Sequence, residues 1–544
     1  MANKPSVFRL VASRSLVTEE ILGYDYPGKG IPDEPYAVDF IPEDPRNPML
    51  FSQPMKWWIT VIMAFGTLAV SFESAVMSGS IQQVEVNLNA GTEVSILTVS
   101  LYVLGFAIGP MSWAPLSEIF GRQVIYLISF GLCTIFGACS IASQNITTLL
   151  VLRFFAGCCG ASAVVNAAAV IGDIFSARER GLALIVFCSA PFMGPTLGPI
   201  CGGFLSQAAG WRWVDALGVI FCAVMWIVGV IFVPETYAPC ILQRRAAKLS
   251  KMTTSVYMSK LEVERGSKTL MEVLRVALVR PWMLLFFEPI VLLLSIYTAI
   301  VYGILYMQFA AFPIVFENSR HWSQGISGLS FLGVLIGQIL AFFIYLVFDG
   351  RYKKTLTQAG GRHPPEERLW SAMLGGVLLP IGLFWFAWTI YDSIHWIVPL
   401  IGTAFFGIGQ VLLFISLINY TVDAYTVFAA SSLAANAILR ALFGFALISL
   451  FSPMFTTQMF ENLGYHWAAS VPAFLALVCM PVPFLFYRYG ARIRSVCKFA
   501  TEADKIMAAL LGQMNAAAAA KKDDPEKQDG VVDNTAPMSS SDTE

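Results

Sequence analysis

The sequence has few charged residues for its length. Of its 544 residues, 13% are charged and 56% are hydrophobic, whereas soluble proteins carry roughly 25% charged residues. The 35 Lys and Arg residues nearly balance the 36 Asp and Glu residues, so the formal net charge is −1. A chain without excess positive charge has no field that would hold nucleic acid. The composition therefore indicates a membrane protein and excludes a nucleic-acid-binding one.

Histidine is scarce, and cysteine forms no framework. The four histidines are scattered through loops and span ends, and most of the ten cysteines lie inside apolar runs. No zinc-like cysteine spacing, HExxH pair, GxSxG turn or phosphate-binding Walker loop is present. We therefore expect no cofactor, no metal site and no enzymatic activity.

The N-terminal region also lacks a cleavable signal peptide. Residues 1–56 are polar and are broken by prolines between Pro27 and Pro48. They contain no short apolar core followed by a small-residue cleavage site. The first apolar run, which begins at Trp57, must then serve as an uncleaved insertion signal.

Long apolar runs dominate the rest of the chain. A helix needs roughly 20 apolar residues to cross about 30 Å of hydrocarbon, because lipid cannot satisfy an unpaired backbone amide. Runs of that length occur twelve times, and the alternating pattern of a membrane barrel is absent. The predicted spans are residues 57–79, 92–113, 123–142, 147–170, 181–207, 213–234, 284–311, 325–348, 369–391, 395–421, 427–451 and 467–487.

A polar stretch between Pro234 and Pro281 separates six spans from the other six. The fold class is thus an all-α membrane protein with two six-helix bundles, and Leu270–Leu278 has the periodicity of a short surface helix. The predicted segments are a cytosolic tail (1–56), a first bundle (57–234), a cytosolic linker (235–283), a second bundle (284–488) and a cytosolic C-terminal tail (489–544).

Loop charges predict the orientation. If both termini are cytoplasmic, the inside loops and tails hold 31 Lys and Arg residues, and the outside loops hold only Arg212 and Arg320. Basic residues collect on the cytoplasmic side of membrane proteins. This asymmetry therefore places both termini in the cytoplasm.

The fifth span carries the most distinctive local pattern. Its glycines recur at intervals of four residues, which places them on one stripe of a helix where a second helix can approach closely. Prolines in the same run remove amide donors and let the helix bend. The run consists of Gly194, Pro195, Gly198, Pro199, Gly202 and Gly203.

This run closely resembles the antiporter motif of the major facilitator superfamily, which is found in its drug/proton antiporter branches. Trp113–Arg122 resembles the loop between spans 2 and 3 of that superfamily, although Ala114 and Ile119 depart from the usual pattern. Arg153–Gly160 resembles the fourth-span motif of its proton-coupled members. Similar features extend from Asn47 to Arg494 and are those of the fungal twelve-span group. The resemblance implies two bundles that rock around a central cavity.

Charged residues inside spans point to a coupling site. An ionisable group at the bilayer centre costs roughly 2.5 to 3.5 kcal/mol or more, so it should face a cavity or a partner. Asp215 and Asp392 lie nearer to span ends. The residues expected to couple protons or to line the substrate cavity are Glu73, Arg153, Tyr297, Tyr302, Tyr306 and Arg440.

Three of these residues have structural alternatives. Glu73 could instead have a structural role near the extracellular rim, and Arg153 could hydrogen-bond to an unwound carbonyl. Arg440 could bind an anion or pair with a neighbouring helix. For Glu288, near the cytosolic start of span 7, we expect a packing or gate contact.

The resemblance also implies a cytoplasmic gate. Its expected residues are Glu118, Gly121, Arg122, Asp173, Arg178 and Asp423, with Arg180 close by. The stripes Gly105 with Gly109 and Gly333 with Gly337 give spans 2 and 8 close-packing faces, so spans 5 and 8 are expected to form a moving seam.

Together these features predict a secondary transporter that exports small organic molecules in exchange for protons by alternating access. The alternative is a facilitator or symporter for an organic acid or another metabolite. The expected partners are a small-molecule substrate, protons and the lipid bilayer, with the chain as a monomer in the plasma membrane or the vacuolar membrane. The charge of the substrate stays open, since Arg440 favours an anion whereas Glu73 beside the aromatic residues favours a cation.

Overall fold

Helices make up nearly all of the computed structural model. It describes residues 7–506 except 14, 16, 177–178, 267–269, 359–364 and 448–456. Within these residues, twelve helices are long and apolar enough to cross a membrane. The predicted twelve-span, all-helical fold class is therefore confirmed. The division of the chain into five segments stays a prediction.

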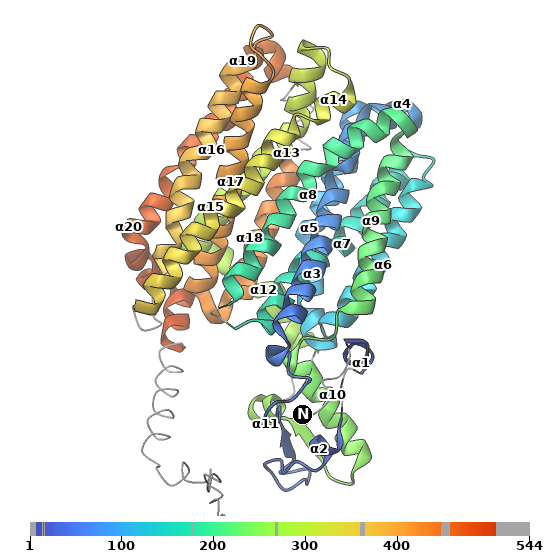
Figure 1. The fold of residues 1–544 in the computed structure, drawn as a ribbon, viewed down its shortest axis with the longest axis vertical. Helices are drawn as coiled ribbons and strands as arrows, with labels where there is room; N and C mark the ends of the chain where they lie inside the picture. The colour runs from blue at the N-terminus through green and yellow to red at the C-terminus, as the bar shows by residue number, and fades with distance from the viewer. Residues whose placement is uncertain are drawn as a thin grey trace, which may run out of the picture.

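The first six spans run with short connections (Figure 1). They are α3 (Gln53–Val76), α5 (Thr92–Phe120), α6 (Arg122–Ile141), α7 (Ile146–Ile174), α8 (Arg180–Ala209) and α9 (Trp211–Phe232). The short helices η2 (Met77–Ser80) and α4 (Ile81–Leu88) extend α3. Gly121 and Gly210 join consecutive spans with φ of 97° and 88°, which a residue with a side chain rarely adopts.

The second six spans differ from the predicted bounds mainly at their ends. They are α13 (Pro289–Pro313), α15 (Phe331–Gln358) after α14 (Gln324–Gly328), α16 (Leu369–Thr389), α17 (Ile397–Tyr425), α18 (Ala429–Ala446) and α19 (Thr457–Cys479) with α20 (Pro481–Val496). The expected surface helix is longer than predicted, because α12 (Leu270–Phe287) takes in the first residues of predicted span 7. The short helices η3 (Ile314–Ser319), η4 (Pro365–Arg368) and η5 (Thr426–Phe428) lie between spans. The end of predicted span 11 lies outside the described residues.

Helix contacts define two groups. In the first, α3 packs on α8 and α9, α5 packs on α7, and α6 packs on α7 and α9. In the second, α16 packs on α17 and α19, α15 packs on α17, and α13 packs on α18. The groups meet where α5 contacts α18 and where α8 contacts α14 and α15.

The glycine stripes of spans 2 and 8 lie inside their own groups. A Cβ on Gly105 or Gly109 would overlap the backbone of α7, and a Cβ on Gly333 or Gly337 would overlap α17. The contact between α8 and α15 uses other residues, including a hydrogen bond of 3.0 Å from Gln338 Nε2 to Thr196 Oγ1. Spans 5 and 8 do meet, but these glycines are not what joins them.

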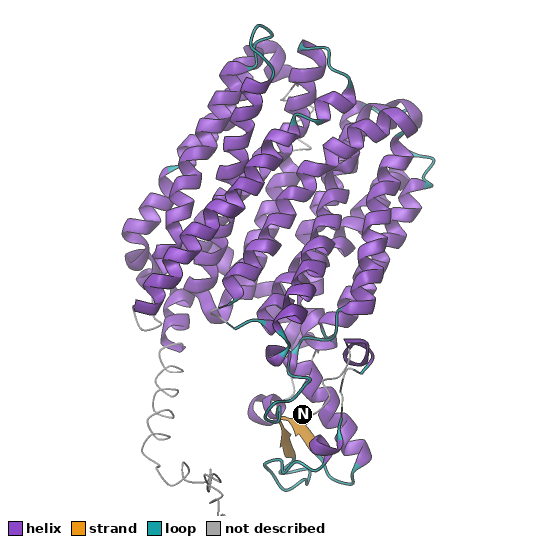
Figure 2. Cartoon of the chain, in the orientation of Figure 1, coloured by secondary structure: helices purple, strands orange, loops and turns teal. Residues whose placement is uncertain are grey.

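The N-terminal region and the connection between the bundles fold together beyond one end of the spans. Strand β1 (Tyr36–Val38) pairs in parallel with β2 (Tyr257–Ser259) beside helix α10 (Ala238–Met252) (Figure 2). The shared apolar core consists of Ile21, Tyr26, Val38, Ile41, Leu242, Ala246 and Leu249. The short helices of this region are α1 (Val7–Ala12), α2 (Glu19–Leu22), η1 (Pro48–Leu50) and α11 (Lys260–Arg265).

A buried ion pair locks this unit. Arg245 donates to both carboxylate oxygens of Asp44, at 2.5 and 3.2 Å, and neither side chain is exposed. We call this assembly of the N-terminal region with α10, β2 and α11 the tail unit, and the end of the bundles that bears it the tail side. The sequence predicted only a polar tail and a linker here, because the pairing of segments about 200 residues apart leaves no local pattern.

Candidate functional site

Three helices of the first group bring charged residues together in the protein interior. Arg153 of α7 donates through Nη1 to Glu73 of α3, and the same nitrogen lies 2.8 Å from Asp215 Oδ1 of α9. The three residues are 0%, 2% and 0% exposed, respectively. We call Glu73, Arg153 and Asp215 the charge triad.

The triad is held by further hydrogen bonds. Arg153 Nε donates to the Thr98 carbonyl at 3.1 Å, and Nη2 donates to the Glu73 carbonyl at 2.9 Å. Ser140 Oγ donates to Asp215 Oδ2 at 2.5 Å, and the guanidinium lies 4.9 Å from the centre of the Tyr102 ring. Arg153 thus makes both the carbonyl contacts of its structural alternative and the carboxylate contacts of its functional one.

One oxygen of Glu73 stays unsatisfied. Its Oε2 has no hydrogen-bond partner among the described residues, although the side chain is buried. A Cβ on Gly218 of α9 would overlap this oxygen, so the carboxylate fits only because position 218 is glycine. Two ionised carboxylates against one guanidinium leave a net negative charge in a buried site, which is costly. A single proton on the triad would make it neutral.

Asp215 was missing from the set of site residues expected from the sequence. Its place near the start of span 6 suggested a span end, yet the structure buries it beside Arg153. The available signal was a lone carboxylate in an apolar run, since such a group needs a partner. Which arginine would meet it depended on how α7 and α9 pack.

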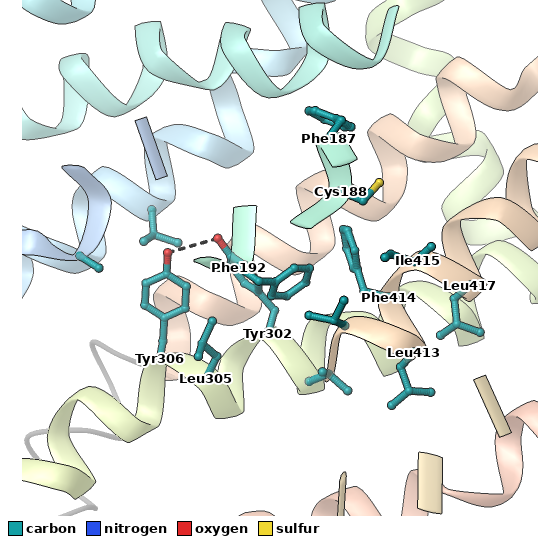
Figure 3. Packing of buried hydrophobic residues seen from close by; sticks show 14 of the residues in the cluster. Phe187, Cys188, Phe192, Tyr302, Leu305, Tyr306, Leu413, Phe414, Ile415 and Leu417 are labelled. Atoms are coloured by element: carbon teal, nitrogen blue, oxygen red, sulfur yellow. Dashed lines mark hydrogen bonds between the residues drawn. The ribbon is translucent and has the colours of Figure 1, made fainter. Parts of the chain in front are cut away.

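A second cluster lies where the two groups of helices meet. Tyr302 and Tyr306 of α13 share a hydrogen bond of 3.2 Å, and Tyr306 also bonds to Ser74 of α3 at 3.0 Å. Phe192 of α8 contacts Tyr302 and Phe414 of α17, with ring centres 6.1 and 4.5 Å apart (Figure 3).

Arg440 of α18 completes this cluster. Its guanidinium carbon lies 4.9 Å from the Tyr302 ring centre and 4.8 Å from that of Phe414. We call Phe192, Tyr302, Tyr306, Phe414 and Arg440 the aromatic cluster.

Tyr297 does not join the aromatic cluster. A Cβ on Gly376 of α16 would lie 3.3 Å from the Tyr297 hydroxyl, so this ring points into the second group of helices. Tyr297 therefore lies apart from Tyr302 and Tyr306, and its place in a substrate cavity stays a prediction. Successive residues of a helix point in different directions, and Tyr297 lies five positions from Tyr302.

Glu73 does not lie against the aromatic cluster either. Ser74 of α3 faces Tyr306, while the neighbouring Glu73 faces Arg153 and α9. The two candidate sites are therefore separate, and they adjoin through adjacent residues of α3.

The Gly-Pro run of α8 packs against α3. A Cβ on Gly194, Gly198 or Gly202 would come within 3 Å of α3 backbone atoms, whereas Gly203 faces α14. Pro195 and Pro199 lie inside the helix, and a Cβ on Gly328 would overlap the Pro199 carbonyl. The stripe therefore brings α8 against the helix that carries Glu73.

The expected gate residues divide between two places. Arg122 Nε lies 3.3 Å from Asp173 Oδ2, Nη1 donates to Ser117 Oγ at 2.5 Å, and the Arg122 backbone amide donates to Glu235 Oε1 at 2.8 Å. Gly121 leaves the room that the Glu235 carboxylate occupies. Glu235 was not expected in this group.

Two predicted gate residues lie elsewhere. Glu118 is exposed and makes no ion pair with any residue that the structure describes. Asp423 accepts from Arg368 Nε at 2.9 Å and from the Tyr352 hydroxyl at 3.2 Å, in the second group of helices. Arg178 lies outside the described residues.

The same charge arrangement occurs in both halves. An arginine near the start of the third span of each half, Arg122 or Arg368, pairs with an aspartate at the end of the fourth, Asp173 or Asp423. Asp349, which also pairs with Arg368, lies where a Cβ on Gly181 of α8 would be 3.3 Å away. The ends of α8 and α15 therefore approach each other on the tail side.

Tyr237 connects the first of these pairs to the tail unit. Its ring lies 4.6 Å from the Arg122 guanidinium, just before α10 begins. Burial, reinforced by the charge of Glu118, raises the pKa of the Tyr237 hydroxyl to about 12. This hydroxyl therefore stays neutral at physiological pH.

Comparison with known proteins agrees with this architecture. The family model of the Major Facilitator Superfamily matches residues 63–446. The multidrug transporter mdrA of Aspergillus fumigatus is 51% identical over 98% of this chain and 87% of its own length. The efflux pump MFS2 of Trichophyton rubrum is 54% identical over 94% of this chain and 85% of its own.

Solved structures show the same fold. The proton:xylose symporter XylE, bound to a sugar analogue, aligns with a TM-score of 0.58 at 17% identity and covers 81% of this chain and 96% of its own. The human organic anion transporter MFSD10 aligns with a TM-score of 0.53 at 15% identity and covers 79% of this chain and all of its own. At such identities the likeness concerns the fold alone. The family match and the close relatives show that this chain belongs to the Major Facilitator Superfamily, as a multi-pass membrane transporter of small molecules with twelve spans.

Proposed function

We propose that this protein exports small organic molecules in exchange for protons, by alternating access. The names of its close relatives, a multidrug transporter and efflux pumps, support export. The observation that carries proton coupling is the charge triad, in which two buried carboxylates share one guanidinium.

The triad offers a mechanism for coupling. Without a bound proton, both carboxylates are ionised and held by Arg153; a proton on Glu73 weakens its attraction to the guanidinium and relieves the excess negative charge. Gly194, Gly198 and Gly202 pack α8 directly on α3, so a change at Glu73 can move α8 against the second bundle. The proton then biases which side of the bundle is open.

The loop charges support a cytosolic tail side. In that orientation the two Arg–Asp pairs and the approach of α8 to α15 lie at the cytosolic mouth, where they can close one state. Inward movement of a proton makes about 2.3 kcal/mol per 100 mV available. We place the protein in the plasma membrane as a monomer.

Flux in proteoliposomes tests this function. Purified protein should move substrate against its gradient only when a pH gradient is imposed. Glu73→Gln removes the carboxylate proposed to take the proton, and Arg153→Ala removes the guanidinium that holds it when ionised, so both variants should lose uphill movement. Arg153→Lys keeps the charge but loses the planar fork, so it should restore transport only in part.

The matched control is Glu93→Gln, which removes an exposed carboxylate at the start of α5 and should leave flux unchanged. Full gradient-driven transport by Arg153→Ala would reduce that arginine to a packing role. The alternative function, symport or facilitated passage of an organic acid, is favoured by Arg440, a cation with no carboxylate partner among the described residues. Under the same gradient a symporter moves substrate with the protons, and a facilitator shows no gradient dependence.

A further inference from the structure

Arg440 is a half-buried arginine in a membrane span, and it differs from the arginines that pair with acids; Arg46, buried in the tail unit, also lacks a described ion pair. Arg122, Arg153, Arg245 and Arg368 each pair with an aspartate or glutamate. Arg440 forms no ion pair and no hydrogen bond with any residue in the described part of the chain. Its contacts there are the rings of Tyr302 and Phe414.

Aromatic rings leave the donors of this guanidinium free. A ring attracts the cation across its face, but the five N–H bonds of arginine lie in the guanidinium plane and need acceptors there. Donors kept from water without an acceptor are costly. Arg440 is partly accessible, so water or a ligand can supply those acceptors.

Arg440 lies where a transported ligand is expected to bind, near the middle of the membrane and between the two bundles. It lies eleven residues after the start of α18, which is about 17 Å along the helix and near the middle of a hydrocarbon layer about 30 Å thick. Tyr302 and Phe414, the two rings that contact Arg440, belong to the second bundle and both contact Phe192 of α8 in the first bundle, and Cys188 of α8 lies near the guanidinium. Both bundles therefore contribute to its surroundings.

A second polar side chain nearby is also unsatisfied. Gln410 is fully buried, and neither atom of its amide has a partner among the described residues. It lies one helical turn before Phe414 on α17, so the two side chains share a face of that helix. Its amide can donate to or accept from a polar substituent of a ligand.

The acids that could attract a cation are engaged elsewhere. Glu73 and Asp215 both contact Arg153, and Glu73 is directed away from Tyr306. A cationic ligand among the rings would thus meet Arg440 and no free carboxylate in the described residues around it. The geometry favours a ligand of negative charge.

We propose that the substrate is an organic anion, an oxyanion such as a carboxylate attached to a flat apolar body. This proposal rests on the function proposed above and names the substrate class of that transporter. The carboxylate accepts two in-plane hydrogen bonds from Arg440. The flat body lies against Phe192, Tyr302 and Phe414, and Gln410 binds a polar substituent.

Binding without any gradient tests the proposal directly. The probes are 2-naphthoate, the neutral 2-naphthamide and the cationic 2-naphthylmethylammonium, which share one ring system, and the full-length protein is held in lipid nanodiscs. We expect equilibrium dialysis to show the carboxylate bound at least about tenfold more tightly than the other two, since hydrogen bonds to charged groups are the stronger ones. Arg440→Gln should remove this preference, and Arg440→Lys should keep part of it. Arg488→Gln, an exposed arginine beside Tyr489, should bind as the wild type does.

Thermal unfolding separates ligand binding from a structural role. Arg440→Gln loses two ring contacts but no ion pair or hydrogen bond with a described residue, and it removes a charge whose donors lack acceptors. The ligand-free variant should therefore unfold at a temperature no lower than the wild type does, and 2-naphthoate should raise the unfolding temperature of the wild type alone. A lower unfolding temperature of the ligand-free variant, or equal binding of carboxylate and amide, would overturn the proposal. If Arg440→Gln cannot be purified, unchanged 2-naphthoate binding by Arg440→Lys overturns the two-bond geometry.

Flux measurements distinguish this inference from the proposed function. If the anion binds through Arg440 but no pH gradient moves it, export by proton exchange fails and the binding site stands. If a gradient drives 2-naphthylmethylammonium but not 2-naphthoate, the substrate class is wrong and proton-coupled export stands.

Discussion

A glycine in α9 controls the space beside the charge triad. A Cβ at position 218 would overlap Glu73 Oε2, and the carboxylate has little room to move because it is 2% exposed. The position of Glu73 beside Arg153 therefore requires a residue without a side chain at position 218. The sequence did not single out this residue, since a glycine in a span has many possible roles.

Gly218→Ala should displace Glu73 from Arg153 and cost about 1 to 3 kcal/mol through overpacking. Gradient-driven flux should fall severalfold or be lost while the protein still reaches the membrane. Gly172→Ala on α7 is the matched control, because a Cβ there meets no atom within 4 Å. Normal coupling by Gly218→Ala would show that the position of this carboxylate is not critical.

At the scale of helices, the Gly-Pro run joins α8 to the helix of Glu73. The sequence predicted a close-packing stripe, and the structure shows that its partner is α3 of the same bundle. The α8 face toward the second bundle carries Phe192 and Thr196 instead. Thus α8 has one face against α3, the helix that carries Glu73, and another against the second bundle.

Gly198→Leu should therefore force α8 away from α3, since a Cβ alone would lie 2.8 Å from the Ala75 backbone. We expect transport to be lost while surface expression survives, as measured by flux and by surface labelling. Ala208→Leu adds the same side chain at an exposed position of α8 and should be tolerated. Normal transport by Gly198→Leu would remove the α3–α8 contact from the mechanism.

The tail unit depends on a different kind of contact. Breaking the Asp44–Arg245 pair leaves an unpaired buried charge, so Asp44→Ala should destabilise the unit by about 3 to 5 kcal/mol. Limited proteolysis should then cut the N-terminal region faster. Asp44→Ala combined with Arg245→Met should recover much of the resistance, because no charge is left unpaired. Equal proteolysis of single and double variants would contradict this account.

At the scale of the whole molecule, orientation decides the direction of transport. Ser323 precedes α14 at the end opposite the tail unit, and Thr254 lies exposed in the tail unit. In a protein freed of its ten cysteines, a cysteine at Ser323 should react with an impermeant reagent from outside. A cysteine at Thr254 should react only after permeabilisation. The reverse pattern would show that the orientation is inverted, so that the movement assigned here as export would be import.

By itself the sequence determined the twelve spans and the family resemblance, and it singled out Arg153 as a charge inside a span. Each of these follows from local composition or from a short motif. A span needs about 20 apolar residues, and a charge inside a span is costly unless it has a partner or faces a cavity. The fold class needed no knowledge of which helix touches which.

Only the tertiary structure decided the partners. Helix packing sets which faces meet. It places Asp215 beside Arg153 and Glu235 beside Arg122, and it directs Tyr297 away from the aromatic cluster. The tail unit was equally hidden, since its strands are separated by more than 200 residues in the sequence. Likewise, the sequence left Arg440 and Glu73 as rival indicators of substrate charge. In the structure Glu73 pairs with Arg153, whereas Arg440 contacts aromatic rings and no described acid, so the packing favours an anionic substrate.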